Sequence, residues 1–362
     1  MIISKNNIKN IDTDHLISDL INQNKIDNIL FIVPTNRKLR NLKKQLIKEC
    51  PGKTTSGITI ETLTTLSVKL LKNLIPFSES SEAAMAVMLK TSINNLELGY
   101  FGGKGSSIPD GTLDRIKNVI SEYKKNLVSP EMLFQEAEKL TPLEKRKAKD
   151  IAIIYESYLK YCKTLKSFEI GDIYRELIIQ DKNEIKKSFE GLFPKVKTAF
   201  ISGFNQFYKP EIEIINRISG FLQNELFINF DYYVNNQMIF SHLNECFYFF
   251  EKNGFRQVFD KSGSSSNGFK NIIRENLFLK KNFCTDLFKE KVTLIEAKNR
   301  SEEVELIAKE IKLLLKEDKT EPSDICVAFN LISNYSSFVR EIFPSYGIPL
   351  NLTDRISTDS SQ

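Results

Sequence analysis

Over the first 77 residues, segments with the apolar pattern of a buried strand alternate with segments that have the apolar spacing of a helix. Asn28–Thr35 is a nearly continuous apolar run that ends at Pro34, which predicts a buried strand of a parallel sheet. Residues 37–48 carry leucine and isoleucine at helical spacing among arginine and lysine, which predicts an amphipathic helix. A second strand at 57–63 and a second helix at 64–74 follow. Strands and helices in alternation indicate an α/β sheet.

A long helical stretch separates two groups of predicted strands. Residues 78–190 show apolar positions at helical spacing, so we expect an all-helical insertion there. Strands at 196–202 and 225–230, with a helix at 211–222 between them, resume the sheet over 191–288. The sheet is therefore expected to combine two separate pieces of the sequence.

A second α/β domain is predicted over 289–362, because the alternation of strands and helices starts again there. We expect the chain to stop inside this domain. The predicted strands are 292–297, 325–329 and 348–352, and the predicted helices are 302–316 and 334–344.

The composition is that of a globular protein with a sizeable core, since 41% of the 362 residues are hydrophobic and 27% are charged. The net charge of +5 is too small to indicate nucleic-acid binding without a local concentration of basic residues. The N-terminus lacks the apolar region of a signal peptide, and no apolar run is long enough for a bilayer. These features predict a cytoplasmic protein with no membrane contact.

The pattern of cysteine and histidine argues against a metal centre in this chain. The cysteines are scattered without a CxxC pair, which favours reduced thiols over a zinc or iron–sulfur site. His15 and His242 lie far apart in the sequence. We therefore expect no metal-binding residue here. The cysteines are Cys50, Cys162, Cys246, Cys284 and Cys326.

Several segments, taken in order, resemble the helicase-like region of AddB/RexB-type subunits. Residues 29–46 resemble the surroundings of helicase motif Ia, and residues 58–71 resemble the next helicase strand and helix. FEIGDIYREL at 168–177 resembles the acidic segment before the Walker B strand. Residues 196–215 resemble a decayed Walker B region, and the run from Val292 to Leu350 resembles the opening of the second helicase lobe.

The resemblance implies a P-loop-NTPase-like fold of the superfamily I helicase type, with parallel sheets in two lobes and an all-helical insertion. It divides the chain into a first part of lobe 1A at 1–77, a 1B-like insertion at 78–190, a second part of lobe 1A at 191–288, and a truncated lobe 2 at 289–362.

The resemblance also implies a function. The chain would be an ATPase-inactive, DNA-binding and scaffolding region of an AddB-type subunit. That subunit would form part of an ATP-dependent helicase–exonuclease that repairs double-strand breaks by recombination. Its partners would be DNA, as a single strand or a duplex end, and an AddA-type helicase subunit.

Two alternatives stay open. One is a nuclease subunit whose PD-(D/E)xK site, with Mg²⁺ and possibly a 4Fe–4S cluster, lies beyond residue 362. The other is a protein–protein scaffold without DNA contact.

The residues that ATP hydrolysis requires are missing. No G-x-x-x-x-G-K-[ST] sequence is present, and residues 1–28 contain no glycine. PGKTT at 51–55 lies between a predicted helix and a predicted strand, the reverse of a P-loop. Ser202-Gly203 stands where Walker B carboxylates would hold Mg²⁺, and Asn330 stands where relatives often carry arginine. We expect neither a nucleotide cofactor nor ATP turnover in this chain.

A formal PD…ExK match is best explained as chance. It joins Pro109-Asp110 to Glu122-Tyr123-Lys124, but residues 112–126 are predicted to form a helix. The nuclease motif requires neighbouring strands around a metal, so we expect no catalytic residue here.

DNA contacts are expected at the carboxyl ends of the first-lobe strands. Hydroxyl, amide and guanidinium groups there suit phosphates, and exposed aromatic rings suit bases. The aromatic candidates could instead belong to the core, and the basic helix at 37–48 could be a solvated face. Residues 247–250 are expected in the core. The candidates are Thr35, Asn36, Arg37, Arg40, Thr62, Thr64, Phe204, Phe207 and Tyr208.

Overall fold

The structure is a computed structural model, and the chain divides into two units, Met1–Lys281 and Asn282–Gln362. In the part of the chain that it describes, no helix is both long and apolar enough to cross a membrane. The residues described are 1–5, 10–23, 25–50, 57–94, 96–102, 108–222, 225–230, 232–260, 268–279, 288–316 and 320–352.

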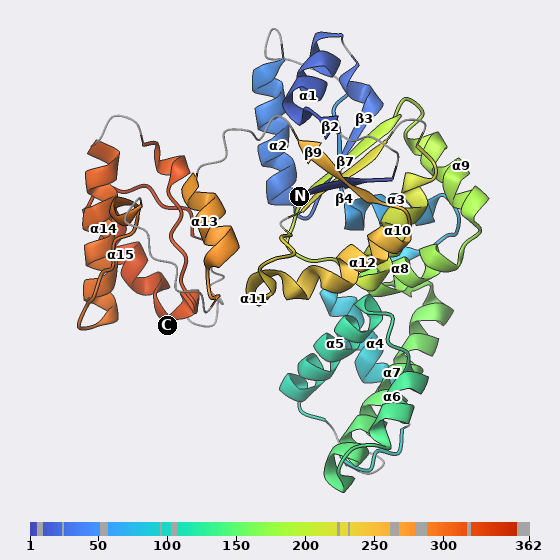
Figure 1. Cartoon of the computed structure of the whole chain (residues 1–362). Helices are drawn as coiled ribbons and strands as arrows, with labels where there is room; N and C mark the ends of the chain where they lie inside the picture. Colours follow the sequence, from blue (N-terminus) through green and yellow to red (C-terminus); the bar gives the residue numbers. More distant parts are fainter. Residues whose placement is uncertain are drawn as a thin grey trace. The chain divides into compact units, whose positions relative to one another are not determined.

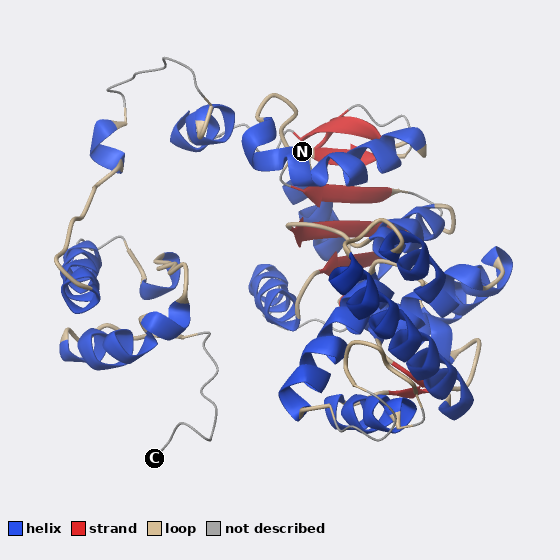
Figure 2. Ribbon diagram, turned by 90° about the horizontal axis from the view of Figure 1, so that it is seen from below, coloured by secondary structure: helices blue, strands red, loops and turns tan. Residues whose placement is uncertain are grey.

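A seven-stranded sheet with the order β2-β9-β1-β8-β7-β3-β4 forms the centre of the first unit (Figure 2). Its parallel part confirms the four strands expected in this region. The register pairs Ile29 with Thr198 and Leu30 with Thr59. The parallel strands are β3 (Ile29–Val33), β4 (Thr59–Thr62), β7 (Thr198–Phe204) and β8 (Leu226–Phe230).

Three further strands make the sheet mixed, and the sequence did not predict them. β1 (Ile2–Ser4) lies antiparallel between β8 and β9 (Arg256–Asp260). β2 (Asn10–Ile11) pairs with β9 in the parallel direction. β1 and β2, with three and two residues, are too short to show a period of two, so only their distant partners define them.

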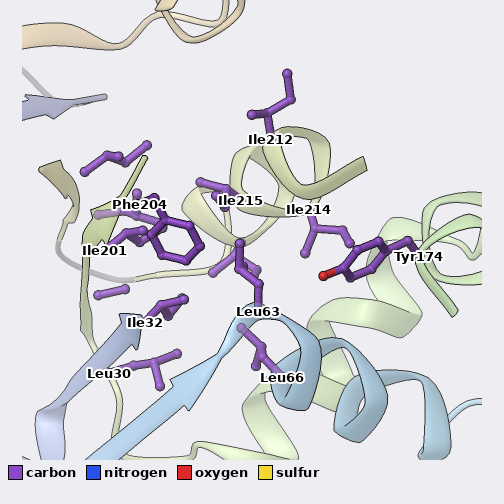
Figure 3. Packing of buried hydrophobic residues seen from close by; sticks show 14 of the residues in the cluster. Leu30, Ile32, Leu63, Leu66, Tyr174, Ile201, Phe204, Ile212, Ile214 and Ile215 are labelled. Carbon is purple, nitrogen blue, oxygen red and sulfur yellow. The ribbon is translucent and has the colours of Figure 1, made fainter. Parts of the chain in front are cut away.

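Both faces of the sheet are covered, which explains why β3 is apolar along its whole length. Ile29 and Phe31 point into a core that also contains Leu46 of α2 (Asn36–Glu49). Leu30 and Ile32 alternate with them and point into a larger core on the opposite face. Figure 3 shows part of this larger core.

The helices of the first unit pack around the sheet or below it (Figure 1). Around the sheet lie α1 (Thr13–Asn22), α2 (Asn36–Glu49), α3 (Leu63–Lys72), α8 (Ile170–Ile179), α9 (Lys182–Leu192), α10 (Lys209–Ser219), α11 (Gln237–Phe240) and α12 (Asn244–Lys252). α13 (Gly268–Asn276) is held by Asn236, whose side-chain amide donates to the carbonyl oxygens of Arg274 and Leu277.

The helices predicted over 78–190 are present, but they divide between two cores. α4 (Glu82–Ile93), α5 (Asp110–Lys125), α6 (Pro130–Ala137) and α7 (Pro142–Leu165) surround a core of their own. α8 and α9 instead contribute Tyr174, Leu177 and Phe189 to the core beneath the sheet. A short parallel pair, β5 (Ser78–Glu79) with β6 (Ser167–Phe168), interrupts the helical run.

The second unit packs α14 (Arg300–Lys316) against α15 (Ser336–Ser345) through Val304, Ala308 and Phe343. Both helices were predicted.

The strands predicted in this unit at 292–297, 325–329 and 348–352 are wrong, because the described residues there form no strand. The backbone at Val292 is extended (φ −130°, ψ 118°), but no strand of the described residues pairs with it. Leu294 is 93% exposed, so this apolar segment lacks the sheet that would bury it.

Candidate functional site

The carboxyl ends of β3, β4 and β7 meet at one edge of the sheet, because these strands are parallel. From β3 the chain moves to β4 on one side, and from β7 it moves to β8 on the other. The strand order therefore reverses between the neighbouring strands β3 and β7. Open α/β sheets bind ligands outside such a point.

The loop after β3 leads directly into α2 and exposes polar groups at this edge. Thr35 caps the helix, since its hydroxyl accepts the backbone N–H of Lys38 at 3.2 Å. Thr35, Asn36, Arg37 and Arg40 are all exposed. A helix N-terminus with unpaired N–H groups and nearby guanidinium groups is suited to a phosphate.

The loop after β4 presents only one of its two candidate threonines. Thr62 is 5% exposed, and its hydroxyl accepts the backbone N–H of Thr65 in a capping box at the start of α3. Thr65 also donates its hydroxyl to Glu61, whose other oxygen pairs with Lys69 at 2.5 Å. Thr64 is exposed, so it alone is available to a ligand.

A lysine of α2 covers the end of β7. The Lys38 ammonium group donates to the carbonyl oxygen of Gly203 at 3.0 Å. Gly203 lies in a bulge with φ +81°, and a Cβ there would collide with the Lys38 side chain. Lys38 was not among the residues predicted for this site. The sequence feature that could have identified this residue is a lysine in the first helical turn after β3. It lies opposite the Ser202-Gly203 pair.

One of the aromatic candidates, Phe204, is a core residue, which corrects its expected role as a base-stacking platform. Phe204 is 6% exposed and stacks on Phe207, with ring centroids 4.6 Å apart (Figure 3 shows Phe204 beside Ile201). Phe207 in turn meets the edge of Phe250, which is fully buried. Phe204 therefore lies in the core, whereas Phe207 is half-buried and packs one ring face on Phe204.

Tyr208 is partly exposed, like Phe207, and it contacts α5. Its hydroxyl lies 3.4 Å from Glu122, and the Lys125 ammonium group lies 5.8 Å from its ring centre. Burial raises the pKa of Tyr208 above its ordinary value. Phe207 and Tyr208 are therefore the two aromatic candidates whose side chains are partly exposed to a ligand.

A buried carboxyl group fixes the backbone at Tyr208. Glu211 accepts the Tyr208 N–H and the hydroxyl of Tyr174, each at 2.9 Å. Burial raises the pKa of Glu211, although both hydrogen bonds act in the opposite direction. Burial, together with the Glu211 carboxylate, also raises the pKa of Tyr174. The Glu211 carboxyl group therefore anchors the loop after β7.

A buried ion cluster joins α5, α7 and α8, and sequence reasoning missed it. Lys124 is 0% exposed, and its ammonium group lies 2.6 Å from Glu169, 2.8 Å from Asp172 and 4.2 Å from the centre of the Tyr158 ring. Burial acts to lower the pKa of Lys124, but Asp172 and Glu169 outweigh it, and the pKa is raised. Gly171 lies directly against this lysine.

The formal nuclease match does not form a site. Asp110 and Lys124 occupy opposite ends of α5, about 21 Å apart along the helix axis. Asp110 is exposed and pairs with Lys90, whereas Lys124 is buried. Among the described residues, no group of three or more histidine, cysteine, aspartate or glutamate side chains is arranged to hold a metal ion. The PGKTT segment lies outside the described residues.

Comparison with known proteins identifies the family. The family described as "ADDB, N-terminal" matches residues 12–230. The chain is 25% identical over 263 residues to the B-type subunit of the ATP-dependent helicase/deoxyribonuclease of Caldanaerobacter subterraneus subsp. tengcongensis, covering 67% of the chain and 22% of that protein. It is 20% identical to the protein of the same name from Clostridium tetani, covering 94% of the chain and 31% of that protein. The chain thus spans less than a third of these relatives, and it belongs to the AddB family as a match to its N-terminal region.

Proposed function

We propose that this chain is an ATP-independent, DNA-binding and scaffolding region of an AddB-type subunit. The subunit would act in a helicase–nuclease that processes double-strand breaks for recombination, with an AddA-type subunit as the motor. The names of the relatives support this setting, since both are B-type subunits of an ATP-dependent helicase/deoxyribonuclease.

The contact between Lys38 and Gly203 carries the proposal. A working ATPase keeps this edge of the sheet open for phosphates and places carboxylates there for Mg²⁺. Here the Lys38 side chain lies over the end of β7, and Ser202 and Gly203 provide no negative charge. The edge instead exposes Thr35, Asn36 and neighbouring arginines, which are suited to phosphates of a DNA backbone.

ATP turnover by the chain is expected to stay at background, with or without single-stranded DNA. The reason is the missing carboxylate at the end of β7, because without it Mg²⁺ and the attacking water have no ligand there. Phosphate release from ATP measures this directly. The same assay on Lys38→Ala provides the control. DNA-stimulated turnover that disappears in this variant would show that Lys38 serves a nucleotide and would contradict the proposal.

Removing Arg37 and Arg40 together is expected to weaken single-strand binding equally for all base compositions. If each residue neutralises one phosphate, the slope of log affinity against log salt should fall by about 1.4, or about 0.7 per phosphate on a single strand. Fluorescence anisotropy at several salt concentrations measures both quantities.

The double variant Lys43→Ala/Lys44→Ala is the matched control for this experiment. It removes two exposed charges from the same helix, farther from the end of β3. An equal fall in slope for both variants would mean that α2 attracts DNA only as a diffuse basic surface. No fall in either would favour a scaffold without DNA contact.

A further inference from the structure

An apolar groove of about 250 Å³ lies on the helical insertion, between α5, α6 and the start of α7 (Figure 1 labels these helices). Its walls are mostly apolar, and Tyr123, Leu133 and Ile151 come from three different helices. Leu143 is 58% exposed and lies one helical turn before Lys147, which lines the groove. Exposed apolar side chains that gather around a groove indicate an interaction surface.

Two charged side chains line the groove, and they have opposite signs. They are Glu144 and Lys147, and neither forms an ion pair within the part of the chain that the structure describes. The Glu144 carboxylate accepts one hydroxyl group at 2.6 Å, and the Lys147 ammonium group lies 5.9 Å from the centre of the Tyr100 ring. The neighbouring Lys145, by contrast, is neutralised by Glu138. A surface that holds one unpaired charge of each sign is complementary to a copy of itself.

The order of residues at the start of α7 fits an antiparallel crossing of two such helices. With a two-fold axis between residues 144 and 147, each residue that lines the groove on this segment faces a residue of suitable chemistry on the other copy. Ala148 is the smallest of them, so it leaves room for a leucine. Lys145 would face Arg146 across the axis, but it is turned toward Glu138. The facing pairs are Glu144 with Lys147, Leu143 with Ala148, and Leu140 with Ile151.

We propose that this groove is an interface between two copies of the chain, in which the α7 helices cross antiparallel about a two-fold axis. Leu143 of each copy would enter the groove of the other beside Ala148, between two ion pairs of Glu144 with Lys147. Small contacts of this kind associate weakly, so half of the chains should be paired at roughly 10–100 µM. The interface needs neither DNA nor the function proposed above.

Sedimentation of the whole chain over a range of concentrations, without DNA, measures this association. Leu143→Asp should leave a monomer throughout, because pairing would bury an unpaired carboxylate in the groove. Aspartate in the first turn of a helix favours the helix, so this variant should fold. Leu165→Asp is the matched control, since Leu165 is 55% exposed at the other end of α7 and its replacement should leave pairing unchanged.

The two charges provide a second test, because reversing one can be compensated by reversing the other. Glu144→Lys or Lys147→Glu alone would place like charges opposite each other twice in each dimer, and should weaken association by about tenfold. The double variant Glu144→Lys/Lys147→Glu exchanges the two signs and should restore it. Lys160→Glu reverses a charge about 20 Å farther along α7 and should change nothing.

Three results would overturn the interface. The first is an unaltered chain that stays monomeric over the whole concentration range, which would leave the groove to a different partner. The second is a dimer that survives Leu143→Asp. The third is a double charge variant that pairs as poorly as the single variants, because the antiparallel register requires it to recover. Circular dichroism of each variant identifies those that have folded, and the first result depends on no variant.

Discussion

Replacing Lys124 by alanine is expected to lower the free energy of unfolding by about 3–5 kcal/mol. The substitution would leave Asp172 and Glu169 buried and close together without a cation between them. Removing one partner of a buried ion pair costs this much because the remaining charge can neither reach water nor find a new partner. The contact of the lysine ammonium group with the Tyr158 ring would also be lost.

Urea denaturation of the whole chain, followed by circular dichroism, measures this loss. Lys125→Ala is the matched control, because Lys125 is the next residue on α5 and its salt bridge to Glu122 is partly exposed. Exposed pairs contribute about 0–1 kcal/mol, so this variant should unfold at nearly the original urea concentration. Equal losses in the two variants would show that the buried cluster has no special role in stability.

Gly171→Ala is expected to destabilise the protein by about 3 kcal/mol, the upper part of the usual range for overpacked sites. A Cβ at this position would lie 2.7 Å from the carbonyl carbon of Lys124 and 2.8 Å from the backbone nitrogen of Lys125. These are backbone atoms of α5, so no side-chain rotation relieves the contact. α5 and α8 would have to move apart, which would also stretch the ion pair between Lys124 and Asp172.

Gly191→Ala provides the comparison for this substitution. Gly191 is also helical, in α9, but a Cβ there would meet nothing within 4 Å. Alanine should therefore be neutral or stabilise the protein by up to about 1 kcal/mol, through its higher helix propensity. Thermal unfolding of both variants gives the result. A Gly171→Ala protein as stable as Gly191→Ala would refute the close crossing of α5 and α8.

The sequence predicted the parts of the fold whose signal is local. β3, β7 and β8 were recognised because strands covered on both faces are apolar along most of their length. The second unit shows the limit of this signal. Residues 325–329 have the composition of a buried strand, but a strand also needs a hydrogen-bonded neighbour, which the described residues do not provide.

The candidate site was predictable only where exposure follows from local structure. Arg37 and Arg40 lie on the polar face of an amphipathic helix, so their exposure could be inferred. The burial of Thr62 and Phe204 depends on a helix cap and on aromatic neighbours brought together by the fold. Lys124 is the clearest case, because a lysine in the last turn of a helix is usually solvated, and only α7 and α8 bury it.

The position of β1 has a consequence for the order of folding. Ile3 pairs with Ile228 on one side and with Gln257 on the other, so the first strand completes its ladder only with residues more than 220 positions away. During synthesis at about 5–20 residues per second, these N-terminal residues leave the ribosome many seconds before their partners. Contacts of such high contact order form slowly. The parallel strands and their helices would therefore assemble first, and β1 would enter the sheet as one of the last steps, after β9 has been made.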